Sequence, residues 1–451
     1  MSNLGEKKPN SENSNRFRAP PPDHLRREID LSLGDIPSSF ELMEKTLESI
    51  RTQSVSTHSP YFMNQLFSGV SPETKLAENF LTEIKTTMAT YEVSPVLTVI
   101  EKTVIESLGH LFGWTSNETD GVAVPGGSAG NFMALHCARQ KSYPDLRKTG
   151  LIGHHRFRVF TSKESHYSLK KACVVLGLGE DALIQVDVDK LGRMCPKDLE
   201  TKIEQEIQLG ATPLMINVTS GTTVLGSFDP INEISKVSQK YNLWLHLDSA
   251  WGGPAIFHSG LKKYFDGSES ADSISFDAHK LLGATLTSSF FLTRHPKILL
   301  EANDVSGGDY LFHQDEPIWD LGKKSWQCGR RPEAFLFWIL WKTHGANGFQ
   351  EMIERLISVR DQSVTWIKKQ GRLELVADPQ FLNVCVRVVP PNQKVDPSWS
   401  KRVRNTLRDQ DIAFVNFSTD EKGSFLRLIF AHPKIKFEHV QHILSQALEV
   451  T

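Results

Sequence analysis

The chain has 451 residues, 39% of them hydrophobic and 23% charged, which is typical of a globular protein large enough for at least two packed units. Lys and Arg number 51 against 53 Asp and Glu, and the formal charge of −2 argues against a nucleic-acid-binding scaffold, which would need a basic face. No apolar segment is long enough to span a bilayer, and no apolar signal segment lies near Met1, so we expect no membrane role. The five cysteines form no CxxC pair, so we expect neither disulfides nor a metal site, and a cytoplasmic protein.

The N-terminal region divides into two parts by composition. Residues 1–28 are polar and charged and include three consecutive prolines at 20–22, a pattern that predicts a disordered tail. Residues 29–110 are expected to form a helical segment.

Short apolar strands alternate with amphipathic helices from about residue 120 to residue 300. Between two of the strands, Asp229 is expected to cap a helix whose first residue is Pro230. The alternation predicts an α/β fold with a mostly parallel sheet flanked by helices on both faces, and we assign residues 111–345 to this large domain. The buried strands are expected at 157–161, 214–218, 243–247 and 272–276.

A smaller unit is expected at the C-terminal end, over residues 346–451. It begins with a helix that carries Met352, Leu356 and Val359 at helical spacing. The order of helix, strands and helix predicts a small α+β domain. Its strands are expected at 381–389 and 424–430, and its final helix at 440–448.

Lys280 lies in the loop that follows the strand expected at 272–276. Ligands of parallel α/β sheets bind at the carboxyl ends of the strands, so this position is a candidate site. Its neighbours Ala278, Leu281 and Leu282 are small or apolar, which favours a neutral amine over an ammonium group. A neutral amine can form a Schiff base with an aldehyde. An isolated lysine is more often a solvated surface charge, and that alternative stays open.

Asp248 ends the strand expected at 243–247 and therefore lies at the same edge of the sheet. A carboxylate there could keep a pyridine nitrogen protonated. Two opposite charges about 4 Å apart, at an effective dielectric of about 20, attract each other by about 4 kcal/mol. An interaction of that size would raise the pKa of the pyridine nitrogen by about three units. Ala250 is small enough to pack flat against such a ring. An aspartate that only caps a turn is the alternative.

A glycine-rich segment at residues 125–131, PGGSAGN, precedes a helix that carries Phe132, Leu135 and Ala138. The free amides at a helix start bind anions. Because the segment lacks the patterns of ATP-binding and dinucleotide-binding loops, a single phosphate fits best. An ordinary tight turn is the alternative.

His166 follows the strand expected at 157–161. Its imidazole could stack on a flat heteroaromatic ring, or it could be a histidine that caps a helix in the core. An aldehyde-trapping lysine, a pyridinium carboxylate, a stacking imidazole and a phosphate cradle together describe a site for pyridoxal 5′-phosphate.

These segments and several others resemble the pyridoxal-phosphate-dependent group II amino-acid decarboxylases, nearest the branch that holds glutamate decarboxylase and cysteine sulfinate decarboxylase. The resemblance implies fold type I, with a large cofactor-binding domain and a small C-terminal domain. It also implies a homodimer with active sites at the interface, on which the segment at 29–110 would dock. The further matching segments lie at 58–69, 90–95, 165–171, 219–230, 246–253, 277–283, 327–330 and 425–427.

The resemblance assigns roles to individual residues of the cofactor site. Lys280 would form the Schiff base, Asp248 would pair with the pyridine nitrogen and His166 would stack on the ring. These three residues are the expected catalytic groups. Further cofactor-binding residues would be Ser128, Ala129, Thr219, Ala250 and His279.

The resemblance also implies a pocket for a small acidic amino acid. Arg427 would hold the distal acid group of the substrate, because a guanidinium can bind a carboxylate or sulfinate through two hydrogen bonds. Phe67 would shorten the pocket and favour aspartate, cysteine sulfinate or cysteate over glutamate. Gln65 and Thr87 are the other expected pocket residues. The expected reaction is α-decarboxylation to an amine and CO₂.

The chain departs from the family pattern at three places. Asp277 and Ala278 stand where the family usually has Asn and Pro before the histidine and lysine. The pocket segment 87–89 differs from that of relatives, and the loop at 314–322 is shorter and lacks the tyrosine thought to protonate the carbanion. Two alternatives follow, namely a reaction diverted to oxidative deamination or carbon–carbon bond formation, and a non-catalytic relative that keeps the fold for binding.

Overall fold

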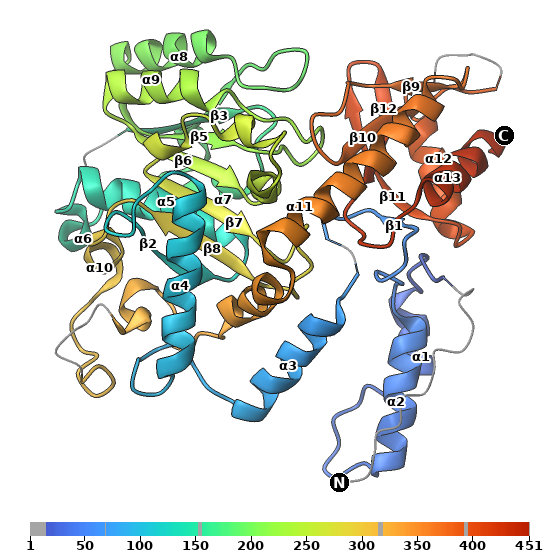
Figure 1. Cartoon of the computed structure of the whole chain (residues 1–451), viewed down its shortest axis with the longest axis horizontal. Helices are drawn as coiled ribbons and strands as arrows, with labels where there is room; N and C mark the ends of the chain where they lie inside the picture. Colours follow the sequence, from blue (N-terminus) through green and yellow to red (C-terminus); the bar gives the residue numbers. More distant parts are fainter. Residues whose placement is uncertain (1–14, 68, 152–155, 314–318, 392–395, 451) are drawn as a thin grey trace.

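The large domain is built on a seven-stranded sheet (Figure 1). The computed structural model describes residues 15–67, 69–151, 156–313, 319–391 and 396–450. Strand β8 is antiparallel to both of its neighbours, and the other neighbouring strands of this sheet are parallel. The predicted mostly parallel sheet is therefore confirmed. In spatial order the strands are β2 (Asp120–Val124), β8 (Ser289–Thr293), β7 (Ser273–Asp277), β6 (Trp244–Ser249), β5 (Thr212–Thr219), β3 (Phe157–Ser162) and β4 (Leu183–Val186).

Helices cover both faces of this sheet, as predicted. Along β8, Phe290 and Leu292 pack into one hydrophobic core, while Phe291 packs into another. A strand that is buried on both faces produces this alternation. The first core receives apolar side chains from α4 (Pro95–Leu111), α8 (Pro196–Gln208) and α9 (Ile231–Tyr241). The second receives them from α5 (Gly127–Ser142), α7 (Ser168–Val175) and α10 (Ile298–Asn303).

The C-terminal part of the chain forms a second sheet with two helices, α12 (Trp399–Asp409) and α13 (Phe437–Glu449). Strands were expected here only at 381–389 and 424–430, so β9, β11 and β1 were not anticipated, and β1 comes from the N-terminal region. It lies parallel to β11, with Phe62 opposite Phe414. In spatial order the strands are β1 (Phe62–Met63), β11 (Phe414–Asp420), β12 (Gly423–Ile429), β10 (Asn383–Val388) and β9 (Leu373–Leu375).

One long helix, α11 (Glu333–Ile367), runs between the two sheets (Figure 1). Gly345 inside it has φ 65° and ψ 175°, so the helical geometry is interrupted there. Glycine adopts a positive φ without the steric cost of a Cβ. The interruption coincides with the predicted end of the large domain, and the domain limits themselves stay predictions.

The N-terminal region packs only in part. Residues 1–14 of the predicted tail lie outside the described residues, whereas Phe17 is buried and its amide donates to Asp411 Oδ1 at 2.5 Å. By contrast, α1 (Pro22–Glu28) and α2 (Phe40–Gln53) contain no buried residue and extend away from the rest of the chain (Figure 1). No helix in the described part of the chain has the length and apolar character of a membrane span. The remaining elements are α3 (Pro72–Ile84), α6 (Leu146–Thr149), η1 (Glu180–Ala182), η2 (Gly253–Phe257), η3 (Lys262–Phe265), η4 (Ser268–Ser270) and η6 (Leu321–Lys324).

Candidate active site

Three of the predicted site residues come together at the carboxyl edge of the large sheet. Strands β5, β6 and β7 are parallel neighbours, and Thr219 at the end of β5 lies opposite Asp248 near the end of β6. Ser249 lies opposite Phe276 of β7, so the loop that carries Lys280 begins at the same edge. The parallel register therefore gathers residues that are far apart in the sequence.

Asp248 is a buried carboxylate that forms no ion pair with another described residue. Its Oδ2 accepts a hydrogen bond from Asn131 Nδ2 at 2.7 Å, and its Oδ1 accepts the Ala250 amide at 3.2 Å. A buried carboxylate without a cationic partner favours a cation beside it. A protonated pyridine nitrogen would supply that cation.

Asn131 of α5 holds this carboxylate in place and was missed by the sequence analysis. Its Nδ2 also lies 2.9 Å from Ser168 Oγ, and its Oδ1 lies 3.0 Å from His246 Nε2. Burial lowers the pKa of His246 to about 4, so its imidazole is neutral. Since an amide oxygen only accepts, the proton of His246 lies on Nε2. A buried amide leaves no periodic signal in a sequence, although Asn131 does end the glycine-rich segment.

His166 is linked to Asp248 by a chain of hydrogen bonds. Its Nδ1 lies 2.9 Å from Ser168 Oγ, and the Ser168 amide also donates to it at 3.3 Å. Asn131 connects the same hydroxyl to Asp248. Burial lowers the pKa of His166, which keeps the ring neutral at neutral pH. A neutral ring held at one nitrogen is suited to stacking on a heteroaromatic ring.

Lys280 has a charged neighbour that the sequence analysis overlooked. Its Nζ lies 3.0 Å from Oδ2 of the buried Asp277. Reasoning from its apolar neighbours alone did not anticipate this ion pair. His279 Nε2 lies 3.9 Å from the same oxygen, and burial lowers the pKa of His279. Asp277 therefore belongs to the site, although neither the residue pattern nor the family resemblance predicts a role for it.

The glycine-rich segment connects β2 to α5. Gly126 has φ 94°, and α5 begins at Gly127 without a side-chain cap. The first amides of a helix have no partner within it, so those of Gly127 and Ser128 are available to an anion. A Cβ at Gly127 would lie 2.7 Å from Asp277 Oδ2 and 2.9 Å from Ala250 Cβ. Only a glycine leaves room at this point.

This set of groups fits pyridoxal phosphate. The unpaired buried carboxylate suits the ring nitrogen, the uncapped helix start suits the phosphate, and the lysine suits the aldehyde. Within the described residues, no three His, Cys, Asp or Glu side chains gather in a way that could hold a metal ion. The role of each residue toward the cofactor stays a prediction.

Asp229 is not the helix cap that the sequence predicted. Helix α9 begins at Ile231, and Pro230 before it provides no side-chain cap. The Asp229 carboxylate instead accepts the amides of Met194 at 2.6 Å and Thr219 at 2.8 Å. Burial raises the pKa of Asp229 to about 7. These contacts fix the end of β5 at the edge that carries the site.

Arg427 on β12 joins segments from both ends of the chain. Its guanidinium donates to Thr223 O at 2.9 Å, in the loop after β5, and to Asn64 O at 2.6 Å, directly after β1. It is buried, and among the described residues its Nε has no hydrogen-bond partner and no acidic side chain pairs with it. Of the neighbouring pocket candidates, Gln65 is exposed and Phe67 is half-buried.

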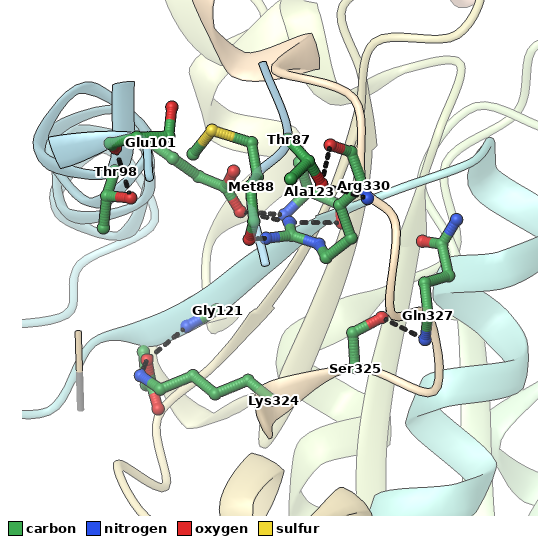
Figure 2. Close-up of polar contacts among 12 residues, drawn as sticks. Thr87, Met88, Thr98, Glu101, Gly121, Ala123, Lys324, Ser325, Gln327 and Arg330 are labelled. Carbon is green, nitrogen blue, oxygen red and sulfur yellow. Dashed lines mark hydrogen bonds and ion pairs between the residues drawn. The ribbon is translucent and has the colours of Figure 1, made fainter. Parts of the chain in front are cut away.

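Thr87, another pocket candidate, belongs to a polar network around Arg330 (Figure 2). Its Oγ1 accepts the Arg330 amide at 3.1 Å. The Arg330 guanidinium donates to the carbonyl groups of Met88 and Ala123 at 3.2 and 3.0 Å. It also donates to the Glu101 carboxylate at 2.5 Å, and both side chains are buried. Arg330 thus joins the pocket segment to α4 and to β2, the strand that leads to the phosphate cradle.

The shortened loop at 314–322 is described only from Trp319 onward, since residues 314–318 lie outside the described residues. The ring of Trp319 lies 5.6 Å from that of Tyr91, and Lys102 Nζ lies 4.5 Å from the Trp319 ring. The Tyr91 amide donates to Asp320 Oδ1 at 3.0 Å. These contacts hold the end of the loop against the segment that carries the pocket residues.

Known proteins resemble this chain over most of its length. The model of the pyridoxal-dependent decarboxylase conserved domain matches residues 22–389. Cysteine sulfinic acid decarboxylase of Mus musculus is 38% identical over 443 residues, which cover 94% of this chain and 89% of that protein. Acidic amino acid decarboxylase GADL1 of Mus musculus is 35% identical over 441 residues, which cover 94% and 80%. The crystal structure of mouse CSAD in apo form has a TM-score of 0.90 at 34% identity, covering 96% of this chain and 92% of that chain.

Proposed function

Because this chain belongs to the pyridoxal-dependent decarboxylase family, we propose that it removes the α-carboxyl group of a small acidic amino acid and releases the amine and CO₂. Family membership confirms the predicted cofactor, pyridoxal phosphate, the amino-acid decarboxylase activity and the α/β fold of these enzymes. The names of the relatives, cysteine sulfinic acid decarboxylase and acidic amino acid decarboxylase, support an acidic substrate. We place aspartate, cysteine sulfinate and cysteate ahead of glutamate.

The observation that carries this proposal is the unpaired charge of Arg427. A buried guanidinium without an acidic partner is unfavourable, so an anionic ligand would stabilise it. The nearby thiol of Cys385 does not neutralise it, because burial raises the pKa of Cys385 to about 12. The distal acid group of the substrate is the anion that we assign to this position.

Phe67 supports a preference for the shorter acids. It lies on the same segment as Asn64, whose carbonyl group holds Arg427. Phe67 is half-buried, and a bulky ring at this point would reduce the length available between Arg427 and the cofactor. Glutamate, with one more methylene group than aspartate, is therefore the least favoured of the four acids.

The residues of the site divide the work of the reaction. When bound, pyridoxal phosphate supplies an electron sink for the electron pair that the departing CO₂ leaves behind. Asp248 would keep the ring nitrogen protonated, and His166 and Ala250 would pack against the ring. Lys280 would anchor the cofactor through its amine. Arg427 orients the substrate, and fixed orientation is a large part of catalysis.

An assay of the purified enzyme with pyridoxal phosphate and each of the four acids tests the proposal. CO₂ and amine should appear in equal amounts, faster from the shorter acids than from glutamate. Arg427→Met should lower kcat/KM for the preferred acid by about 30-fold or more, since truncating one partner of a buried charge pair costs about 2–5 kcal/mol. The absorption band of the bound cofactor should not change.

Arg372→Met is the matched control, because Arg372 also donates to two backbone carbonyl groups, those of Val389 and Leu448. It should leave kcat/KM unchanged. An unaltered kcat/KM in Arg427→Met, or no CO₂ from any acid, would contradict the proposal. Aldehyde and peroxide in place of amine would instead indicate the diverted reaction that the missing loop tyrosine suggests. Cofactor binding without any product would indicate a role in binding alone.

We further propose that the enzyme is a homodimer formed through its N-terminal helices. Neither α1 nor α2 buries a residue, and exposed apolar patches of this kind mark interfaces. Sedimentation equilibrium of the holoenzyme should give twice the mass of the chain, and a single-chain mass at micromolar concentration would contradict the proposal. The large apolar side chains exposed on and around these helices are Leu31, Leu33, Ile36, Phe40, Leu42, Met43, Leu47 and Ile50.

We also propose a cytoplasmic location. All five cysteines of the chain are free thiols. Cytosolic proteins keep their thiols reduced, so the absence of a disulfide among these described cysteines supports that compartment.

A further inference from the structure

Asp277 is a buried acid at the place where the cofactor phosphate is expected to bind. Its Oδ2 lies 3.0 Å from Lys280 Nζ, and its Oδ1 has no hydrogen-bond partner among the described residues. A Cβ on Gly127, the first residue of α5, would lie 2.7 Å from Oδ2. The carboxylate therefore adjoins the helix start whose free amides form the phosphate cradle.

Few groups compensate the charge of Asp277. From its own loop, Lys280 faces it directly and His279 Nε2 lies 3.9 Å from Oδ2. His166, in the loop before α7, would offset this charge only when protonated, and burial lowers the pKa of His166. The start of α5 and the residue that follows β6 carry no titratable side chain. Burial raises the pKa of Asp277, but Lys280, His279 and the hydroxyl group of Ser289 on β8 outweigh it and bring that pKa below its ordinary value. The carboxylate is thus charged before the cofactor enters.

We propose that binding of the cofactor phosphate beside Asp277 takes up one proton, which is then shared between the Asp277 carboxyl group and a phosphate oxygen. A phosphate ester carries a charge of about −1.5 to −2 at neutral pH. Two like charges in a buried site disfavour each other, and one shared proton replaces their repulsion with a hydrogen bond. The unpartnered Oδ1 is available for that bond.

Proton uptake makes the affinity for the cofactor fall as pH rises. Above the second pKa of the phosphate, near ~6, both groups are charged before they meet. In that range the uptake of one proton raises the dissociation constant about tenfold per pH unit. The inference rests on the cofactor, which family membership establishes, and not on the proposed substrate.

Asp277→Asn tests the inference, because an amide keeps the shape of the side chain and removes its charge. The dissociation constant of pyridoxal phosphate is measured by absorbance titration of both proteins, freed of cofactor, from about pH 7 to pH 9. The ratio of the wild-type constant to the variant constant should rise about tenfold per pH unit. Calorimetry in two buffers of different ionisation enthalpy should show that the wild type takes up close to one more proton than Asp277→Asn when it binds pyridoxal phosphate.

A merely structural role of Asp277 predicts the opposite sign. If the carboxylate only holds Lys280 as an ammonium group, the wild type takes up one proton fewer than Asp277→Asn in forming the same Schiff base and should gain affinity relative to the variant as pH rises. A ratio that falls or stays constant with pH would therefore overturn the inference.

A second measurement needs no substitution and covers the case in which the variant does not fold. The wild type should take up close to one more proton with pyridoxal phosphate than with pyridoxal, which has no phosphate. Equal proton uptake with the two compounds would also overturn the inference. No substrate is present in either experiment, so a failure of the proposed acid specificity leaves both results unaffected.

Discussion

Lys280→Ala is expected to abolish the reaction and to remove the visible absorption band of the bound cofactor. The substitution deletes the amine that lies at the carboxyl edge of the sheet, 3.0 Å from Asp277. Removal of a group that acts covalently lowers kcat by about 10⁴- to 10⁶-fold in well-studied enzymes, and a loss of that size is expected here. Stopped assays of CO₂ release and an absorbance spectrum measure the two effects.

Two further variants separate the amine from its charge. Lys280→Arg keeps a positive group beside Asp277 but cannot trap an aldehyde, so it should be as inactive as Lys280→Ala. Lys297→Ala replaces an exposed lysine at the start of α10 and should leave both the band and kcat unchanged. A Lys280→Ala protein that retained the cofactor band would show that another residue holds the aldehyde.

Arg330→Met is expected to destabilise the chain by about 3–5 kcal/mol, because it leaves a buried charge without its partner. The Glu101 carboxylate accepts hydrogen bonds from Arg330 at 2.5 Å and from the Ala123 amide at 2.8 Å, and its second oxygen has no partner among the described residues. The substitution also releases the Met88 carbonyl group and with it the pocket segment (Figure 2). Urea unfolding followed by circular dichroism measures the change in stability.

A variant that lacks both Arg330 and Glu101 tests whether the lost stability comes from the ion pair. Arg330→Met combined with Glu101→Met should recover most of the lost stability, since no uncompensated charge remains. Lys368→Met breaks the exposed pair with Asp378, away from the N-terminal helices, and should change stability by no more than about 0.5 kcal/mol. A double variant that is no more stable than Arg330→Met would show that the guanidinium acts through its carbonyl contacts and not through Glu101.

The order of helices and strands in the large domain could be predicted from local patterns. The strands expected at 214–218, 243–247 and 272–276 correspond to β5, β6 and β7, with small shifts at their ends. Hydrophobic periodicity and turn chemistry act over a few residues, so they are legible in a sequence. The parallel order of the strands then predicts that Asp248 and Lys280 lie at the same edge of the sheet, without any information on side-chain contacts.

The partners of the polar side chains were decided only by the tertiary structure. The sequence placed Asp229 at a helix cap, but the folded chain directs its carboxylate to the amides of Met194 and Thr219. Asn131 reaches Asp248, and Arg427 reaches Asn64, across long stretches of chain. A buried polar group is satisfied by whichever donor or acceptor the packing brings near, and no local pattern records which one that is.

The same distinction applies to the chemistry of the site. Residue type and spacing alone identified a lysine, an aspartate, a histidine and a glycine-rich turn suited to pyridoxal phosphate. That lysine pairs with Asp277, three residues earlier, whose carboxylate lies 3.0 Å from Lys280 Nζ in the folded chain. Charge in a buried site depends on distances of a few ångströms, because electrostatic interactions strengthen as water is excluded. Those distances exist only once the strands and the loop after β7 have packed.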